Sequence, residues 1–270
     1  MDQREHRDEL HEAEMRAMQK LGPNLKEHTE LALAAFNLIG EMLARLPEEV
    51  FAARRQSLKV ANGLLARLAN DMRCVALLAN RGYPIQAGAL GASIYEIAFT
   101  IASIGSDDRL AQQWIDHDNP TKTFEDPWTL TRDGLRKLEI PDADSQTAIE
   151  YRIYSQLCMN KHASPLLQKE HSYRIQDGAI VTLLGPDDTE EAIRPAQFAL
   201  EHAVHLASLA MLSFVQEHLA SRISKKLGEE LLAKVDSLAA SRKALEIKSK
   251  TRWGTEDPFR GKWRGLPLTE

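Results

Sequence analysis

Cysteine and aromatic residues are scarce in this sequence of 270 residues. It contains 2 cysteines, Cys74 and Cys158, and only 6% of its residues are Phe, Trp or Tyr. Both cysteines lie in apolar helical contexts, which excludes a disulfide framework and indicates a reducing compartment. The sequence also lacks a glycine-rich phosphate loop, a nucleophile elbow and the cysteine pattern of a zinc site. No common catalytic motif is therefore present.

Positive charge is also limited. The formal net charge is -5, and the isoelectric point is near 6.0. This balance excludes a protein that is basic over its whole surface, so a contact with RNA or DNA would need a local patch. The N-terminal residues, MDQREHRDEL, lack the apolar segment of a secretory signal. We therefore expect a cytoplasmic protein.

Helix-forming residues dominate what is present. Leu, Ala, Glu and Arg are abundant, and the 43% hydrophobic content is enough for a substantial core. The expected fold class is all-α, a multi-helix bundle with long antiparallel core helices. One small β-hairpin insertion is predicted at about residues 173 to 184, where two β-rich segments flank Asp177 and Gly178. The sequence contains no internal repeat.

Charge and apolar spacing divide the chain into three parts. Residues 1–22 form a charged helical arm that Gly22 and Pro23 should end, residues 23–240 form the bundle, and residues 241–270 form a basic, aromatic tail. The helices are expected at about residues 24–46, 48–80, 86–104, 108–117, 130–138, 145–162, 187–224 and 225–248. Ser106 or Asp107 should cap the helix at 108–117, and Asp144 or Ser145 the helix that ends near His162.

The most apolar stretch runs from Gly82 to Gly105 and carries one formal charge, that of Glu96. Glycines and polar residues interrupt the run, which disfavours a membrane span and favours a core helix. A carboxylate near a core needs a cation or several hydrogen-bond donors. Glu96 should therefore have a partner, either in an active site or in a salt bridge at the edge of the bundle.

Several motifs occur together: RGYPIQAGAL before an apolar SIYE helix, WIDHDNP, YRIYSQLCMNKHASP, a hairpin ending in LGP and a long closing helix. Over about residues 58–217, this combination resembles a family of bacterial helical proteins of unknown function. Members usually carry an arginine shortly before the SIYE glutamate, but here Ala92 and Ser93 occupy that neighbourhood. The other family positions are filled by Glu96, Ser155 and His162. In outline the family is similar to the HEPN superfamily of helical RNase toxins, which is often found near phage-defence genes.

The resemblance implies a candidate RNase site. The superfamily pairs an Arg and a His four to six residues apart, whereas Arg152 and His162 are separated by about 15 Å along one helix. A composite site would then be needed, in one chain or across two subunits. Its residues would be catalytic Glu96, Arg152 and His162, with Ser155, Asn160 and Lys161 for binding. The alternative is that His162 only caps the helix C-terminus.

A metal site is a weaker hypothesis. Glu201, His202 and His205 lie on adjacent positions of one helix, but helical di-metal proteins repeat Glu-x-x-His on two helices, and this motif is absent. We therefore expect neither a metal nor another cofactor.

The tail combines cations with aromatic residues. Its candidate binding residues are Arg252, Trp253, Arg260 and Trp263. Such residues can stack on bases and meet phosphates, or they can dock the tail on a protein partner or on the bundle itself.

Three functions stay open. The first is a helical interaction or scaffold protein, self-associating and part of a bacterial defence or toxin system. The second is an RNase or another effector that acts on RNA or DNA. The third is a pocket for a small ligand or a metal beside Glu96 and His202. None of the three involves a membrane.

Overall fold

The computed structural model describes residues 3–46, 55–118, 124–162, 173–176, 179–182, 185–220 and 224–254. These residues confirm the all-α class. The α-helices are α1 (Gln3–Ala44), α3 (Gln56–Asn80), α4 (Pro84–Ile104), α5 (Asp108–Ile115), α6 (Pro127–Lys137), α7 (Ala143–Lys161), α9 (Ile193–Phe214) and α10 (Lys225–Trp253). A 3₁₀ turn, Glu190–Ala192, precedes α9, and a π-helical segment, Val215–Ala220, follows it.

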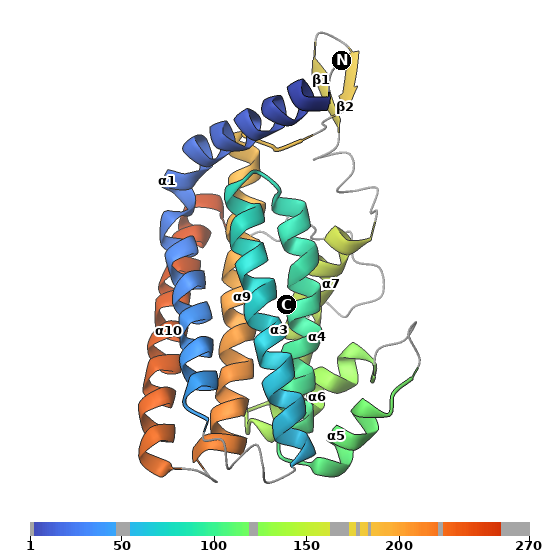
Figure 1. Cartoon of the computed structure of the whole chain (residues 1–270), viewed down its shortest axis with the longest axis vertical. Helices are drawn as coiled ribbons and strands as arrows, with labels where there is room; N and C mark the ends of the chain where they lie inside the picture. Colours follow the sequence, from blue (N-terminus) through green and yellow to red (C-terminus); the bar gives the residue numbers. More distant parts are fainter. Residues whose placement is uncertain are drawn as a thin grey trace.

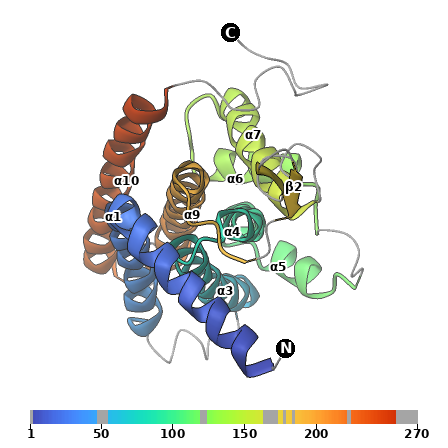
Figure 2. The same ribbon diagram turned by 90° about the horizontal axis from the view of Figure 1, so that it is seen from above.

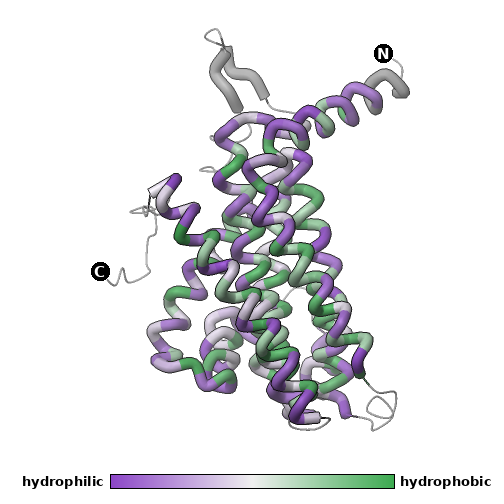
Figure 3. The backbone as a smooth tube through the Cα atoms, turned by 90° about the vertical axis from the view of Figure 1, so that its left-hand side faces the viewer, coloured by the Kyte–Doolittle hydropathy of each residue, from purple (hydrophilic) through white to green (hydrophobic). Residues whose placement is uncertain are grey.

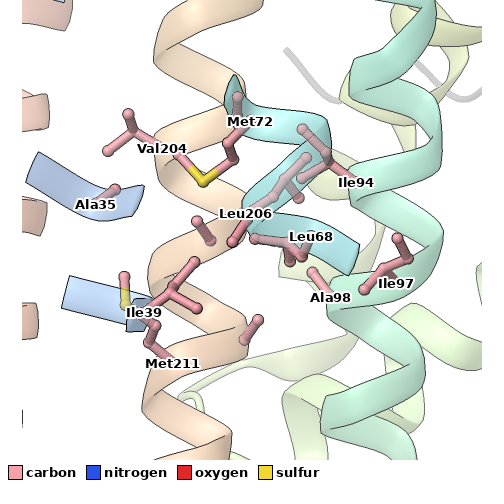
Figure 4. Close-up of a cluster of buried hydrophobic side chains, with 14 of the residues drawn as sticks. Ala35, Ile39, Leu68, Met72, Ile94, Ile97, Ala98, Val204, Leu206 and Met211 are labelled. Carbon is pink, nitrogen blue, oxygen red and sulfur yellow. The ribbon is translucent and has the colours of Figure 1, made fainter. Parts of the chain in front are cut away.

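Two helices, α4 and α9, form the centre of the bundle (Figures 1 and 2). They pack on one another, α3 packs on both, α1 and α10 pack on α9, and α6 and α7 pack on α4. Figure 4 shows side chains from α1, α3, α4 and α9 meeting in one apolar cluster. It includes Ala35, Ile39, Leu68, Met72, Ile94, Ile97, Ala98, Val204, Leu206 and Met211, all of them buried. The apolar stretch around Glu96 is thus a core helix, as predicted.

Both central helices have the length and hydropathy of a membrane span. In Pro84–Ile104 the relevant window is 78% buried inside the bundle, and in Glu190–Ala220 it is 72% buried. Core helices of soluble proteins show the same burial, so this finding is compatible with a soluble protein.

The predicted break at Gly22 and Pro23 is wrong, because α1 continues through both residues. A proline inside a helix removes a hydrogen bond and costs about 3 kcal/mol. Leu21 and Leu25 on either side are fully buried, and burying two leucines returns about 3 to 6 kcal/mol. Figure 1 shows that α1 changes direction along its length, as expected of a helix that contains a proline.

The N-terminal part of α1 projects beyond the ends of the other helices and is mostly hydrophilic (Figure 3). Where it meets the bundle, Glu14 accepts a hydrogen bond of 3.1 Å from the Tyr83 hydroxyl and pairs with Arg81 at 3.3 Å. Further along, the Lys20 ammonium lies 2.7 Å from the Asp188 carboxylate. The arm is therefore fastened to the turn between α3 and α4 and to the segment before α9.

Two short strands, β1 (Tyr173–Gln176) and β2 (Ala179–Thr182), pair antiparallel, with Tyr173 opposite Thr182. The turn residues 177 and 178, on which the hairpin prediction depends, lie outside the described residues.

The predicted helix caps have mixed outcomes. The Asp107 side chain accepts hydrogen bonds from the amides of Arg109 at 2.9 Å and Leu110 at 3.0 Å, as expected for the cap of α5. In contrast, α7 begins after Asp142, so Asp144 and Ser145 lie within the helix rather than at its cap. The predicted cap of α7 is wrong.

Candidate functional site

Glu96 has the partners that its sequence context predicts. Its Oε1 accepts a hydrogen bond of 2.9 Å from the Tyr154 hydroxyl, and the Lys161 ammonium lies 3.7 Å from the same oxygen. The Glu96 side chain is 25% exposed, so the carboxylate lies at the edge of the bundle. A donor and a cation, both from α7, therefore stabilise the one charge of α4.

Two glycines of α4 allow α7 to approach this closely. A Cβ atom added to Gly88 would lie 2.4 Å from Nδ2 of Asn160, and one added to Gly91 would lie 2.7 Å from Cδ2 of Leu157. The QAGALGAS segment thus places the C-terminal half of α7 against α4, where Tyr154 and Lys161 reach Glu96.

The neighbouring groups around Glu96 stay protonated. Burial, the largest cause, and the nearby Cys158 and Glu96 raise the pKa of Tyr154 well above its ordinary value. Burial likewise raises the pKa of the Cys158 thiol. Since the thiolate is the reactive form of cysteine, Cys158 is a poor nucleophile at neutral pH.

The structure does not bring the three proposed catalytic residues, Glu96, Arg152 and His162, to one side of α7. At 100° per residue, Arg152 is on the opposite side of this unbroken helix from Tyr154 and Lys161, the contacts of Glu96. His162 is the exposed C-cap residue, and its amide donates to the Cys158 carbonyl at 2.9 Å. Glu96 and His162 are thus near the same end of α7, while Arg152 faces another part of the molecule.

The other proposed binding residues of α7 bond to their own helix. The Ser155 hydroxyl donates to the Tyr151 carbonyl at 2.9 Å, and the Asn160 amide donates to the Gln156 carbonyl at 3.4 Å.

Arg152 instead lines a groove of about 530 Å³ between α7, α9 and α10. The groove forms because α10 packs on α9 and α1, whereas α7 packs on α4 and α6, which leaves one face of α9 uncovered. Figure 2 shows α7 and α10 on different sides of α9. From α9 the lining residues are Arg194, Gln197, Phe198, Glu201, His202 and His205.

Two buried carboxylates beside the groove pair with imidazoles. Glu201 Oε1 lies 2.8 Å from Nε2 of His28 and also accepts a hydrogen bond from the Ser249 hydroxyl. Glu150 Oε1 lies 2.8 Å from Nε2 of His205. These contacts join α1, α7 and α10 to α9, and they offset part of the cost of burying each acid. Oε2 of Glu150 is buried and has no hydrogen-bond partner among the described residues.

The cations of the groove differ in their partners. Glu246 lies 2.9 Å from the Arg242 guanidinium and 2.5 Å from the Lys250 ammonium, so two cations share one carboxylate. Within the part of the chain that the structure describes, the Arg152 side chain forms neither an ion pair nor a hydrogen bond. Arg152 therefore leaves a positive charge unneutralised on the α7 wall of the groove.

His202 is held in one tautomer. Its Nδ1 lies 2.8 Å from the carbonyl oxygen of Phe198, and a carbonyl can only accept, so Nδ1 carries the proton. Burial, the largest cause, lowers the pKa of His202. The ring is therefore neutral at pH 7, and its Nε2 is a hydrogen-bond acceptor.

Trp253 and Arg252 do not belong to a separate tail, because α10 extends to Trp253. The Trp253 indole donates to the side chain of Gln197 at 2.8 Å. The Arg252 guanidinium lies 4.4 Å from the centre of the indole ring and donates to the Asn24 side chain at 2.8 Å. This part of the predicted tail therefore docks on the bundle itself. Arg260 and Trp263 lie outside the described residues.

No cluster of three or more His, Cys, Asp and Glu side chains with the arrangement of a metal site occurs among the described residues. Glu201 and His205 are engaged in the buried pairs described above.

No protein-family model, curated protein or solved structure matches this chain. The resemblance to the bacterial helical family and to the HEPN superfamily therefore stays a prediction from the motifs.

The groove itself was missed by the sequence analysis, although the sequence carries a signal for it. Arg194, Gln197, Glu201, His202 and His205 recur at helical spacing in an otherwise apolar helix. Such a polar stripe indicates that one face of a central helix is not covered by its neighbours.

Proposed function

We propose that this protein is a helical binding protein whose groove between α7, α9 and α10 holds a small organic anion. The observation that carries the proposal is Arg152, a groove-lining guanidinium with no ion pair among the described residues. A guanidinium presents two parallel donors that suit a carboxylate or a phosphate.

A second group of cations in the groove also favours an anionic ligand. Arg242 and Lys250 share one acid, Glu246, so this group keeps one net positive charge. The two buried acids, Glu150 and Glu201, are each bonded to an imidazole. The volume, about 530 Å³, lies in the usual range of small-molecule sites.

Calorimetric titration with three anions, citrate, AMP and indole-3-acetate, tests this proposal. We expect at least one to bind, and Arg152→Ala to weaken its binding by about tenfold or more, because a charge-assisted hydrogen bond contributes about 1.5 to 3 kcal/mol. Arg73→Ala is the matched control, since Arg73 is an exposed arginine of α3 outside the groove, and it should bind as the unmodified protein does. No binding of any of the three, or equal binding by the Arg152→Ala protein, would overturn the proposal.

RNA cleavage is a second candidate function. It is supported by the Lys161 ammonium, 3.7 Å from Glu96 and one residue before His162, which gathers an acid, a cation and an imidazole at one end of α7. Purified protein should then cleave RNA, and His162→Ala should abolish the cleavage. The same low background in both proteins would remove this candidate.

The broader expectations stay predictions. They are self-association, a protein partner, a role in a bacterial defence or toxin system, and a cytoplasmic location.

A further inference from the structure

We infer that the anion bound in the groove carries a planar ring with an N–H group, and that this group donates a hydrogen bond to Nε2 of His202. The inference rests on the proposed function, because it takes Arg152 as the site of the anionic group. It adds what the ring of the ligand must offer.

His202 is fixed in one tautomer. The contact of 2.8 Å between Nδ1 and the Phe198 carbonyl places the proton on Nδ1 and leaves the lone pair on Nε2. Within the described residues, Nε2 has no hydrogen-bond partner, and His202 lines the groove. A lining group that can only accept favours a ligand that donates.

The groove beside His202 is lined by aromatic rings. The rings of Phe198 and His202 lie 4.0 Å apart, centre to centre, at 35° to one another. The Trp253 indole, held by Gln197 and Arg252, also lines the groove. Aromatic residues make up only 6% of the chain, so two of them in one groove favour contact with a planar ring.

The guanidinium and the aromatic rings lie on different walls of the groove. Arg152 comes from α7, whereas His202 and Phe198 come from α9 and Trp253 from the end of α10. A ligand that spans the groove can therefore place its acid on Arg152 and its ring between His202 and Trp253. Both a carboxylate and a phosphate on a nitrogen-containing ring have this chemistry.

The test compares ring-bearing anions by calorimetric titration of the full chain. Indole-3-acetate is the carboxylate probe and AMP the phosphate probe. Two analogues remove one feature each: 1-methylindole-3-acetate lacks the N–H group, and indole-3-ethanol lacks the charge. We expect indole-3-acetate or AMP to bind, and the probe that binds identifies the acid group the groove prefers.

For the indole probes we expect the N-methyl analogue to bind the unmodified protein about tenfold more weakly than indole-3-acetate, since one hydrogen bond is lost. In His202→Asn the side-chain amide nitrogen can still donate to the Phe198 carbonyl, but the amide oxygen then takes the place of Cδ2 and does not reach the position of Nε2. The tenfold preference should then fall to about twofold or less. In Arg152→Ala both probes should weaken by a similar factor, so the ratio between them should persist.

If AMP is the probe that binds, purine riboside monophosphate, which lacks the amino group of adenine, takes the place of the N-methyl analogue, with the same expected ratios.

These outcomes test the inference about the ring separately from the proposed anion site. The inference is overturned if the unmodified protein binds a probe and its analogue without the N–H group equally, or if His202→Asn keeps the tenfold preference. The proposed anion site would still stand in either case. If neither ring-bearing anion binds, the inference is overturned, and binding of citrate alone would leave a site for small anions without a ring. Urea unfolding of His202→Asn checks that the variant is folded before its binding is compared.

Discussion

The hydroxyl of Tyr154 on α7 donates a hydrogen bond of 2.9 Å to the carboxylate of Glu96 on α4. Glu96 is the one charged residue of the most apolar helix, and its partner comes from a helix 58 residues further along the chain. This bond fixes which side of α7 faces α4. The opposite side of α7, which carries Arg152, then lies in the groove.

Removing the Tyr154 hydroxyl should destabilise the protein. Among the described residues, Tyr154→Phe leaves the Glu96 carboxylate with only Lys161 at 3.7 Å, and a hydrogen bond to a charged group contributes about 1.5 to 3 kcal/mol. Because Glu96 is partly exposed, we expect about 1 to 2 kcal/mol in urea unfolding. Tyr151→Phe, on a neighbouring ring 5.8 Å from that of Tyr154, is the control and should change stability by less than about 0.5 kcal/mol. An equal effect of the two substitutions would show that the bond contributes nothing.

Two glycines should respond to alanine in opposite directions. A Cβ atom on Gly228 of α10 would lie 2.4 Å from Cβ and 2.7 Å from Cα of Ala220, so the backbone must shift. Gly228→Ala should cost about 1 to 3 kcal/mol. Around Gly63, an exposed position inside α3, an added Cβ atom meets nothing within 4 Å. Gly63→Ala should stabilise the protein by about 0.5 to 1 kcal/mol. Thermal unfolding measures both changes, and a shift in the same direction would contradict the packing of α10 on the π-helical segment.

Acid should weaken two helix caps. The amide of Leu110, the largest cause, and that of Arg109 lower the pKa of Asp107, while the hydroxyl and amide of Thr129 lower that of Asp126. Each cap contributes fully to the free energy of unfolding above the pKa of Asp in the unfolded chain, near 4. This contribution is lost as the pH falls through the lowered pKa of the folded state.

The double variant Asp107→Asn and Asp126→Asn removes these two titrations. Its free energy of unfolding should therefore fall less steeply than that of the unmodified protein between about pH 5 and pH 2. Parallel curves for the two proteins would show that the caps do not contribute to acid sensitivity.

The pair of His28 and Glu201 should be expensive to break. The two side chains are 6% and 8% exposed, and His28→Ala leaves the buried carboxylate with only Ser249 as a partner in the part of the chain that the structure describes. Removing one partner of a buried pair costs about 3 to 5 kcal/mol. Glu201→Gln should cost less, because the amide oxygen still accepts from both donors. His11→Ala, at an exposed position of α1, is the control for urea unfolding. A cost below about 1 kcal/mol for His28→Ala would contradict the pairing.

Apolar periodicity predicted most of the fold. It identified the central helix around Glu96 and the long helix that follows Pro186, because both must bury most of their circumference. The predicted helix end at Pro23 is wrong, because the burial of Leu21 and Leu25 outweighs the cost of a proline inside the helix. Apolar periodicity also ended α10 too early, since the docking of Trp253 on Gln197 depends on a contact between distant segments.

The candidate site was predicted only in part. The cost of burying a carboxylate correctly predicted a donor or a cation beside Glu96. The local sequence does not indicate that Tyr154 supplies the hydrogen bond, because the two residues lie on different helices. The groove depends on which helices leave α9 uncovered, and this is a property of the whole bundle. The sequence pattern assigns Arg152 and His202 to two different candidate sites, and only the tertiary structure brings them to one groove.

The central claim is that this groove binds a ring-bearing anion between Arg152 and His202. Long-range ¹H–¹⁵N NMR of the histidine rings, recorded at pH 7 during a titration with indole-3-acetate, tests it most directly. We expect a neutral His202 protonated at Nδ1, whose Nε2 signal moves as the probe is added and moves clearly less at the same concentrations in Arg152→Ala. A His202 ring protonated at Nε2 before the titration, or an Nε2 signal that a saturating amount of probe leaves unchanged, would contradict it.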